Sequence, residues 1–240
     1  MGEDPFGRAI RDYHSGDQQA PLIQRDGERT LEHPIEKFYF TEISGDSKKT
    51  AWIEAHLDGP LLDVGAGAGK HALYFQETYE TVALEVSEQL VEVMANRGVE
   101  KPRHGDMFSL PEQFDRDRFG SVLVHGTQIG LAGSMAGLRA VLFDLAYVTG
   151  QEATAVIDCY DPESEMASEL LGYRADRTPG LAHRVMTFEY DGTVGETLLF
   201  RLFSPDRLRE ATVGTAWELT DIRYGSEQKH YLVALEKKRS

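Results

Sequence analysis

Three glycines at alternate positions follow a short apolar segment in residues 61–69, which read LLDVGAGAG. Glycine lets the backbone turn sharply and lets a ligand approach the main chain, because it has no Cβ atom. The helix expected to begin at Lys70 would point its free N–H groups at whatever lies on this turn. In an open parallel sheet, the carboxyl end of such a strand is where ligands bind. The segment therefore predicts a ligand-binding turn.

A carboxylate follows Gly65 after twenty residues, at Glu85, where the next strand is expected to end. Such a carboxylate can accept two hydrogen bonds from a ribose diol, so the pair indicates a cofactor that contains adenosine. The dinucleotide fingerprint G-x-G-x-x-G is not satisfied, because Lys70 stands where its third glycine belongs. A P-loop, G-x-x-x-x-G-K-[ST], is not satisfied either, because Val64 and His71 occupy its first and last positions.

Short apolar strands and helices alternate over residues 60–160, and these elements must position the turn and the carboxylate. The expected strands are 61–64, 81–85, one that ends at 103–104, 121–125 and 154–159. The helices expected between them are 70–77, one capped by Ser87 that runs to Ala95, and 135–147. This alternation predicts right-handed crossovers and a parallel sheet buried on both faces.

The regions on either side of this core have different patterns. The first 59 residues are polar and irregular, with two helices expected at 6–14 and 48–57. After residue 160 a hairpin is expected from 184–190 and 193–203, around the turn signal Asp191-Gly192. A helix at 205–212 and a final strand pair, 216–224 and 230–236 joined by Gly225-Ser226, complete the chain. We expect a mostly parallel sheet that ends in an antiparallel pair.

Residues 63–69 resemble the first motif of class I S-adenosylmethionine-dependent methyltransferases, including the acidic residue at the strand end. Glu85 matches the ribose-binding acid of that family, and 105–107 (GDM) is similar to the segment whose Asp and next apolar residue hold the adenine. The resemblance covers residues 60–160 well and 204–236 loosely. It implies an α/β, Rossmann-like three-layer sandwich, with a mostly parallel seven-stranded sheet, an antiparallel last strand and a late β-hairpin insertion.

The resemblance implies one methyltransferase domain over residues 1–240 and S-adenosylmethionine as its cofactor. Within that domain, 1–59 would form an N-terminal helical cap, 60–160 the cofactor-binding core, and 161–240 the hairpin insertion and closing antiparallel strands. The implied cofactor-binding residues are Asp63, Gly65, Ala66, Gly67, Gly69, Glu85, Val86, Asp106, Met107, His125 and Gly126.

The segment after the fourth strand departs from one branch of that family. Members that methylate amide or base nitrogens carry (Asn/Asp)-Pro-Pro-(Tyr/Phe) here, whereas residues 125–128 read HGTQ. This difference disfavours a DNA adenine or glutamine substrate. The glycine-rich segment 125–133 resembles a pocket-lining loop of small-molecule methyltransferases, or is simply a flexible connection. A small-molecule acceptor is therefore the favoured substrate.

Methyl transfer from a sulfonium is a one-step displacement, so a base is needed only if the acceptor holds its proton at working pH. His125, Asp158 and Tyr160 are the candidate catalytic residues, because each stands at or beyond the end of an expected strand. The candidate substrate-binding residues are Tyr13, Phe38, Tyr39, Gln128 and Asp161. The N-terminal aromatic side chains could form a lid over the pocket or could fasten their segment to the core.

Composition limits the possible partners. The chain has 25 Lys+Arg and 40 Asp+Glu, hence a net charge of −15, and 41% of its residues are hydrophobic. Such acidity disfavours binding to nucleic acid or to an anionic membrane, and it is typical of proteins kept soluble in concentrated salt. The single cysteine, Cys159, excludes an internal disulfide, and the histidines show no spacing for a metal site. No signal peptide or membrane span is recognisable, so we expect a cytoplasmic protein without a bound metal.

Several alternatives stay open at this stage. The chain could be a methyltransferase for RNA or protein, or a sensor that binds S-adenosylmethionine without catalysis. A nicotinamide-dependent oxidoreductase is disfavoured by the glycine spacing. The hairpin could cover the substrate site, form the contact of a homodimer, or extend the sheet.

Overall fold

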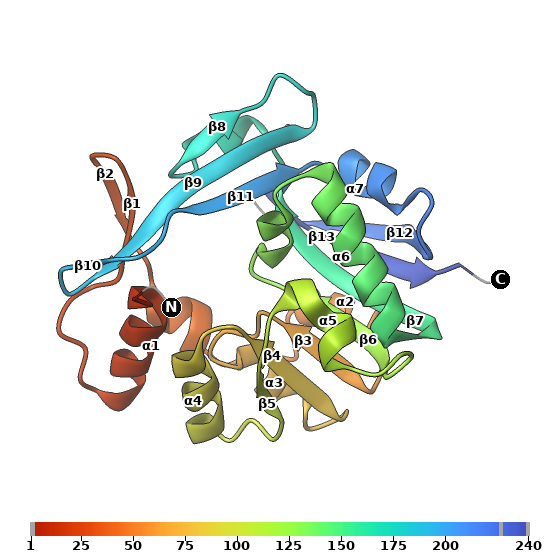
Figure 1. The fold of residues 1–240 in the computed structure, drawn as a ribbon, viewed down its shortest axis with the longest axis horizontal. Helices are drawn as coiled ribbons and strands as arrows, with labels where there is room; N and C mark the ends of the chain where they lie inside the picture. The colour runs from red at the N-terminus through yellow and green to blue at the C-terminus, as the bar shows by residue number, and fades with distance from the viewer. Residues whose placement is uncertain (1–2, 226–227, 239–240) are drawn as a thin grey trace.

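Two β-sheets dominate the computed structural model, which describes residues 3–225 and 228–238 (Figure 1). Within these residues the larger sheet contains seven strands, and β3, which precedes the glycine turn, lies inside it between β6 and β4. In spatial order the strands are β12 (Trp217–Tyr224), β13 (His230–Lys237), β7 (Thr149–Tyr160), β6 (Phe119–Val124), β3 (Leu61–Val64), β4 (Thr81–Glu85) and β5 (Pro102–His104). Neighbours from β7 to β5 are parallel, whereas β13 is antiparallel to both β7 and β12. The expected fold class is confirmed; Ser226, in the expected last turn, lies outside the described residues.

Helices cover both faces of the large sheet, because successive strand residues point to opposite faces and almost all are apolar. Leu62 and Val124 belong to the core beneath α6, whereas Leu61 and Leu123 pack with residues of α2 and α3. One face carries α2 (Lys48–Glu54), α3 (Lys70–Phe75) and α4 (Glu88–Arg97), and the other carries α5 (Leu110–Gln113), α6 (Met135–Val148) and α7 (Pro205–Thr212) (Figure 1). The result is the expected three-layer arrangement.

Capping residues in the sequence predicted the helix ends closely. The Ser87 hydroxyl accepts a hydrogen bond from the N–H of Leu90 and begins α4, and Gly98, with a φ of 89°, ends it. Ser47 caps α2 in the same way, although that helix ends at Glu54, three residues earlier than expected. In the part of the chain that the structure describes, no helix is both long and apolar enough to cross a membrane.

The second sheet is antiparallel and is built around one long strand, β9 (Leu181–Tyr190), which crosses the top of the view in Figure 1. Its other strands are β1 (Ile23–Asp26), β2 (Arg29–Glu32), β8 (Tyr173–Ala175), β10 (Thr193–Val194) and β11 (Leu198–Phe203). The expected late hairpin supplies β9, β10 and β11, with a break between the last two. β9 also pairs with β1, so the late hairpin and the N-terminal segment form one sheet.

The N-terminal segment is only partly the helical cap that the sequence predicted. Helix α1 (Pro5–Ser15) is present and ends at Gly16 as expected, but β1 and β2 form a hairpin that was not predicted. Both strands are short and polar, so they lack an alternating pattern; the one available signal was Gly27 in the two-residue turn. A π-helix, η1 (Glu36–Phe40), follows the hairpin. The remaining helical elements of the described residues are 3₁₀ turns, namely η2 (Met107–Ser109), η3 (Gln128–Ala132) and η4 (Glu165–Glu169).

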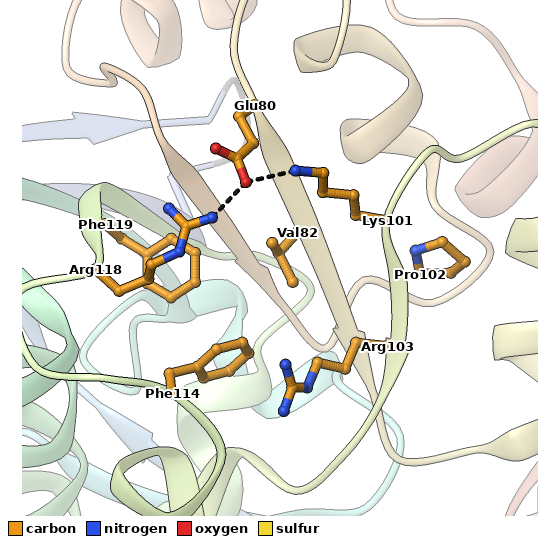
Figure 2. A pocket seen from close by; sticks show the side chains of 8 residues that line it. All are labelled: Glu80, Val82, Lys101, Pro102, Arg103, Phe114, Arg118 and Phe119. Atoms are coloured by element: carbon orange, nitrogen blue, oxygen red, sulfur yellow. Dashed lines mark hydrogen bonds and ion pairs between the residues drawn. The ribbon is translucent and has the colours of Figure 1, made fainter.

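An ion-paired hollow of about 430 Å³ lies at the amino ends of β4, β5 and β6, at the opposite edge of the sheet from the glycine turn (Figure 2). Glu80 accepts hydrogen bonds from Lys101, at 2.6 Å, and from Arg118. These two hydrogen bonds hold the pKa of Glu80 below its usual value. Lys101 and Arg118 are both paired with Glu80. The cluster therefore links the starts of three strands, and these two cations are not available to pair with a ligand.

Candidate active site

The glycine turn needs glycine at three positions. Gly65, Gly67 and Gly69 have φ values of 67°, 58° and 77°, in the left-handed region that other residues rarely adopt. A Cβ atom on Gly65 would lie 2.6 Å from Cγ of Gln128, and one on Gly67 would lie 3.4 Å from the Tyr39 ring. The N–H groups of Gly65 and Ala66 both donate to the carbonyl of Leu84, which ties the turn to β4. The turn therefore has a defined shape.

Glu85 lies against this turn rather than beside open solvent. Its Oε2 accepts the N–H of Gly67 at 2.9 Å, and its Oε1 accepts the N–H groups of Val86 and Ser87 at 2.8 and 3.0 Å. Burial raises the pKa of Glu85, although these three hydrogen bonds act in the opposite direction. Oε2 keeps one lone pair without a partner among the described residues, so it can accept a further hydrogen bond from a ligand.

Asp63, at the end of the turn nearest β3, is 2% exposed, and its Oδ2 has no hydrogen-bond partner among the described residues. Burial, reinforced by the charge of Glu85, raises the pKa of Asp63 to about 7. Two carboxyl groups in close electrostatic contact thus support the turn, one from each neighbouring strand.

Tyr39 of η1 covers the glycine turn. Arg97 of α4 holds this segment in place, because its Nη1 donates to the carbonyl of Tyr39 at 2.9 Å and also to the carbonyl of Ala68. The Tyr39 ring is part of an aromatic cluster with Phe6, His33 and Phe188, whose ring centroids lie 4.7–6.1 Å apart. The N-terminal aromatic side chains therefore both cover the turn and pack on the second sheet.

A single cavity of about 1370 Å³ extends from the glycine turn to the second sheet. At one end it is lined by the turn, Glu85 and Val86, and the Val86 side chain is 65% exposed. At the other end it is lined by apolar side chains of β9 and β11, namely Met186, Phe188, Leu198 and Phe200. The late hairpin thus lines the cavity, which fits one of the three alternatives for its role, that of covering the substrate site.

The carboxyl ends of β6 and β7 and the start of β13 bring a histidine and carboxylate cluster to the middle of this cavity. Asp158 is 1% exposed at its side chain, and it accepts hydrogen bonds from the N–H groups of Gly126 and Thr127 and from Nε2 of His230, the last at 2.8 Å. Burial alone would raise the pKa of Asp158, but electrostatic interaction with His125 and His230, together with these hydrogen bonds, holds it far below the usual value. Asp158 is therefore ionised.

His125 is the other member of this cluster. Burial lowers the pKa of His125 to about 3, with Lys49 and His230 adding to the effect and Asp158 opposing it. Its Nε2 lies 2.8 Å from Nζ of Lys49, and because an ammonium group only donates, the lone pair of that nitrogen is occupied. The ring centroid of His71 lies 4.5 Å from that of His125, with the two ring planes tilted by 46°, and burial lowers the pKa of His71 as well. His125 and His71 are therefore neutral near pH 7.

A chain of side-chain hydrogen bonds connects the second sheet to Tyr39. Nη2 of Arg184 donates to Oε1 of Gln24 at 2.6 Å, and Nε2 of Gln24 lies 2.5 Å from Nδ1 of His33. Nε2 of His33 lies 2.9 Å from the Tyr39 hydroxyl. Burial, together with the charge of Arg184, lowers the pKa of His33 to about 4, so the neutral ring donates through Nε2. The Tyr39 hydroxyl therefore accepts this hydrogen bond, and Tyr39 also lines the cavity.

Most of the residues predicted from the sequence meet in this cavity. Those that line it are Gly65, Ala66, Gly67, Glu85, Val86, His125, Gly126, Asp158, Tyr160, Phe38, Tyr39 and Gln128. Asp63 and Gly69 support the turn from behind. Six further lining residues were not predicted to be in the site, because their sequence positions carry no common signal: Gln24, His33, Lys49, His71, Arg184 and His230.

Two of the expected acceptor contacts are corrected by the structure. Tyr13 does not line the cavity, because its ring stacks on Phe40 at 5.0 Å. Asp161 does not line it either; it is 7% exposed and accepts hydrogen bonds from the Tyr224 hydroxyl and from the N–H of Glu163. Both residues fasten segments of the chain together.

The predicted adenine segment lies next to the cavity but not on its wall. Asp106 caps the 3₁₀ turn η2 by accepting the N–H of Phe108 at 2.9 Å, and Met107 is 8% exposed in the core beneath α6. The exposed apolar residue at the end of β5 is Phe108, at 46%. The turn places Met107 in the core and leaves Phe108 on the surface, outside the residues that line the cavity. Among the described residues, no group of His, Cys, Asp and Glu side chains has the arrangement of a metal site.

Comparison with known proteins agrees with this geometry. Residues 62–128, which contain the glycine turn, Glu85 and the end of β6, match the family described as Methyltransferase domain. Over residues 62–128 the chain is therefore similar to a methyltransferase domain. This match and the shared fold confirm the resemblance inferred from the sequence. No curated protein sequence matches the chain.

Solved structures of methyltransferases share the fold of most or nearly all of the chain. A SAM-dependent methyltransferase from Bacteroides fragilis, solved with S-adenosyl-L-homocysteine, has a TM-score of 0.79 at 21% identity, covering 98% of this chain and 94% of its own. An amino pentose methyltransferase from Micromonospora echinaspora has a TM-score of 0.54 at 19% identity, with 74% and 83% covered. A sugar N-methyltransferase from a Streptoalloteichus species has a TM-score of 0.52 at 18% identity, with 75% and 80% covered.

Proposed function

We propose that this chain binds S-adenosylmethionine and transfers the methyl group to a small-molecule acceptor by direct in-line displacement. The observation that carries the proposal is the single cavity, which contains both the glycine turn with Glu85 and the apolar face of the second sheet. Its volume of about 1370 Å³ exceeds the roughly 300–1,000 Å³ of an ordinary ligand site, so it has room for a cofactor and an acceptor. The neighbours that act on amino sugars also use small-molecule acceptors.

The residues at the turn fit the proposed cofactor. Oε2 of Glu85 has a free lone pair for a ribose hydroxyl, and the exposed side chain of Val86 offers apolar surface for a purine ring. The glycines leave the backbone open to the rest of the molecule. When bound, the cofactor supplies an electrophilic methyl group on a positively charged sulfur.

The protein contributes orientation and exclusion of water. The aromatic cluster and the second sheet cover the cavity from the side opposite the turn. Because positive charge is lost from sulfur as the methyl group moves, a dry surrounding favours the transfer. Because the aromatic cluster and the second sheet cover the cavity, the site suits a small acceptor rather than RNA or a folded protein.

His230 is the group best placed to remove a proton if the acceptor requires it. Its Nε2–H donates to the ionised Asp158, so in the neutral ring the lone pair is on Nδ1. The side chain is 27% exposed and lines the cavity. Of the predicted candidates, Asp158 acts here by orienting His230, and His125 is the weaker base because its Nε2 lone pair faces Lys49.

Calorimetric titration of the full chain tests the cofactor. We expect S-adenosylmethionine and S-adenosylhomocysteine to bind with one site per chain, and NAD to give no binding heat. Binding of NAD, or of none of the three, would contradict the proposal.

Turnover tests whether the chain is an enzyme or a sensor. We expect a small-molecule metabolite extract to drive conversion of S-adenosylmethionine into S-adenosylhomocysteine, measured by mass spectrometry. RNA and protein fractions of the same extract are expected to be inactive. Activity with those fractions alone would favour the macromolecular alternative, and no activity with any fraction would favour the sensor.

Replacement of Glu85 tests the ribose contact. We expect Glu85→Gln to weaken S-adenosylhomocysteine binding by roughly 1.5–3 kcal/mol, about 10- to 150-fold, because a charged acceptor is lost. The fold is expected to lose stability too, since one of the backbone donors that Glu85 satisfies would then face an amide N–H₂. Calorimetry and urea denaturation measure the two effects separately.

The matched control is Glu80→Gln, which removes a carboxylate at the opposite edge of the sheet. Its cofactor affinity should equal that of the unmodified chain. A folded Glu85→Gln variant with unchanged affinity would remove Glu85 from the site.

A further inference from the structure

The guanidinium group of Arg184 is rigidly held at the second-sheet end of the cavity. Arg184 lies on β9, where its backbone pairs with Phe200 of β11 and Tyr173 of β8. Its Nε donates to the carbonyl of Leu171 at 2.9 Å, and its Nη2 donates to Oε1 of Gln24 at 2.6 Å. A guanidinium carries five N–H groups, so three of them have no partner among the described residues.

The charge of Arg184 also has no carboxylate partner within 4.0 Å in the described part of the chain. Three other arginines of the same sheet do have one: Arg25 pairs with Glu189, Arg174 with Asp26 and Arg201 with Asp176, at 2.7–2.8 Å. Burial lowers the pKa of Arg184, which reflects the cost of keeping this charge inside. In so acidic a chain, a partly buried cation left without an anion is a site for an anion from outside.

The surroundings of Arg184 indicate which anion. The Tyr160 hydroxyl lines the same cavity, interacts electrostatically with Arg184, and has no hydrogen-bond partner among the described residues. Met186, Phe188 and Phe200 add apolar surface around them. The site thus offers a planar cation, one free hydroxyl and an apolar wall, which suit a carboxylate on an apolar body.

We propose that the methyl acceptor is a carboxylic acid whose carboxylate binds Arg184 and Tyr160 at the second-sheet end of the cavity. This inference rests on the proposed function, because it names the acceptor class of the same site. It also explains the chain of hydrogen bonds from Arg184 through Gln24 and His33 to Tyr39, which holds the guanidinium in one orientation before the acid arrives.

The test compares acids with neutral molecules of the same shape. The full chain, saturated with S-adenosylhomocysteine, is titrated with phenylacetate and phenylacetamide, and with hexanoate and hexanamide. We expect each acid to bind at least about tenfold more tightly than its amide. Arg184→Gln should abolish the difference, and Arg184→Lys should keep part of it. The matched control Arg201→Gln removes an ion-paired arginine of the adjacent strand that does not line the cavity, and should retain the full preference.

Three outcomes would overturn the inference. The first is that the acids bind no more tightly than the amides, including the case in which neither binds although S-adenosylhomocysteine does. The second is that the acid preference survives in Arg184→Gln. The third is that Arg184→Gln weakens S-adenosylhomocysteine binding itself, which assigns the guanidinium to the cofactor. In each of these cases the proposed function stands. Absence of S-adenosylhomocysteine binding to the unmodified chain would instead contradict the proposed function.

Discussion

A Gly67→Val variant is expected to bind S-adenosylhomocysteine at least about 100-fold more weakly than the unmodified chain, because the new side chain would fill the space between the turn and Tyr39. A Cβ atom at Gly67 already lies 3.4 Å from that ring, so the two methyl groups of valine must extend into the ring or into the ligand space. The φ of 58° adds backbone strain of about 1–3 kcal/mol. Calorimetry measures the affinity, and urea denaturation shows whether the variant is folded.

Gly192→Val is the matched control. Gly192 has a φ of 73° in the turn between β9 and β10, and nothing lies within 4 Å of the place where its Cβ would stand. The control should therefore lose a similar amount of stability while its cofactor affinity stays unchanged. If Gly67→Val bound the cofactor normally, the glycine turn would not be the binding site.

An Asp63→Asn variant is expected to be more stable than the unmodified chain at pH 8 and nearly equal to it at pH 4. Burial raises the pKa of Asp63 in the folded state to about 7, from an ordinary value of 3.8. Between these values the folded protein holds a proton that the unfolded chain has released. The free energy of unfolding of the unmodified chain therefore falls as the pH rises from about 4 to about 7, and then levels off.

The size of this effect follows from the pKa difference. A difference of about 3 corresponds to roughly 4 kcal/mol, which Asn should recover at pH 8 because it is neutral and has nearly the same shape. Urea denaturation between pH 4 and pH 8 measures it. Glu85, whose pKa burial also raises, is present in both proteins, so the difference between them reports on Asp63.

Asp206→Asn is the control for this series, since the side chain of Asp206 is 85% exposed on α7. Its stability should follow that of the unmodified chain at every pH. Parallel pH profiles for Asp63→Asn and the unmodified chain would show that Asp63 is ionised in the folded protein and would refute the raised pKa.

Short-range signals account for what could be predicted from the sequence. The turn at 65–69, the caps at Ser87 and Gly98, and the alternation of strands and helices depend on a few neighbouring residues, and the structure confirms them. Glu85 was also predictable, because parallel neighbouring strands place their carboxyl ends at one edge. These signals were sufficient for the fold class and for the glycine-turn end of the site.

The part of the cavity that is proposed to bind the acceptor could not be predicted in this way, because its residues meet only through pairing between distant segments of the chain. Tyr13 and Asp161 have suitable side chains but pack on their own neighbours, whereas His230 enters the site through the pairing of β13 with β7. No local pattern distinguishes these cases. Whether an aromatic or ionisable side chain lines the cavity depends on which face of its segment is buried.

The fold class, the glycine turn and the nearby carboxylate could be predicted from the sequence, since each depends on backbone conformation or strand order over short distances. The pairing of the N-terminal hairpin with the late hairpin in a second sheet became visible only in the folded chain, where β1 and β9 pair across about 160 residues. That pairing places Gln24 beside Arg184 and closes the cavity over the turn. The physical reason is that contacts between distant segments depend on how whole layers pack, which the composition of either segment alone does not specify.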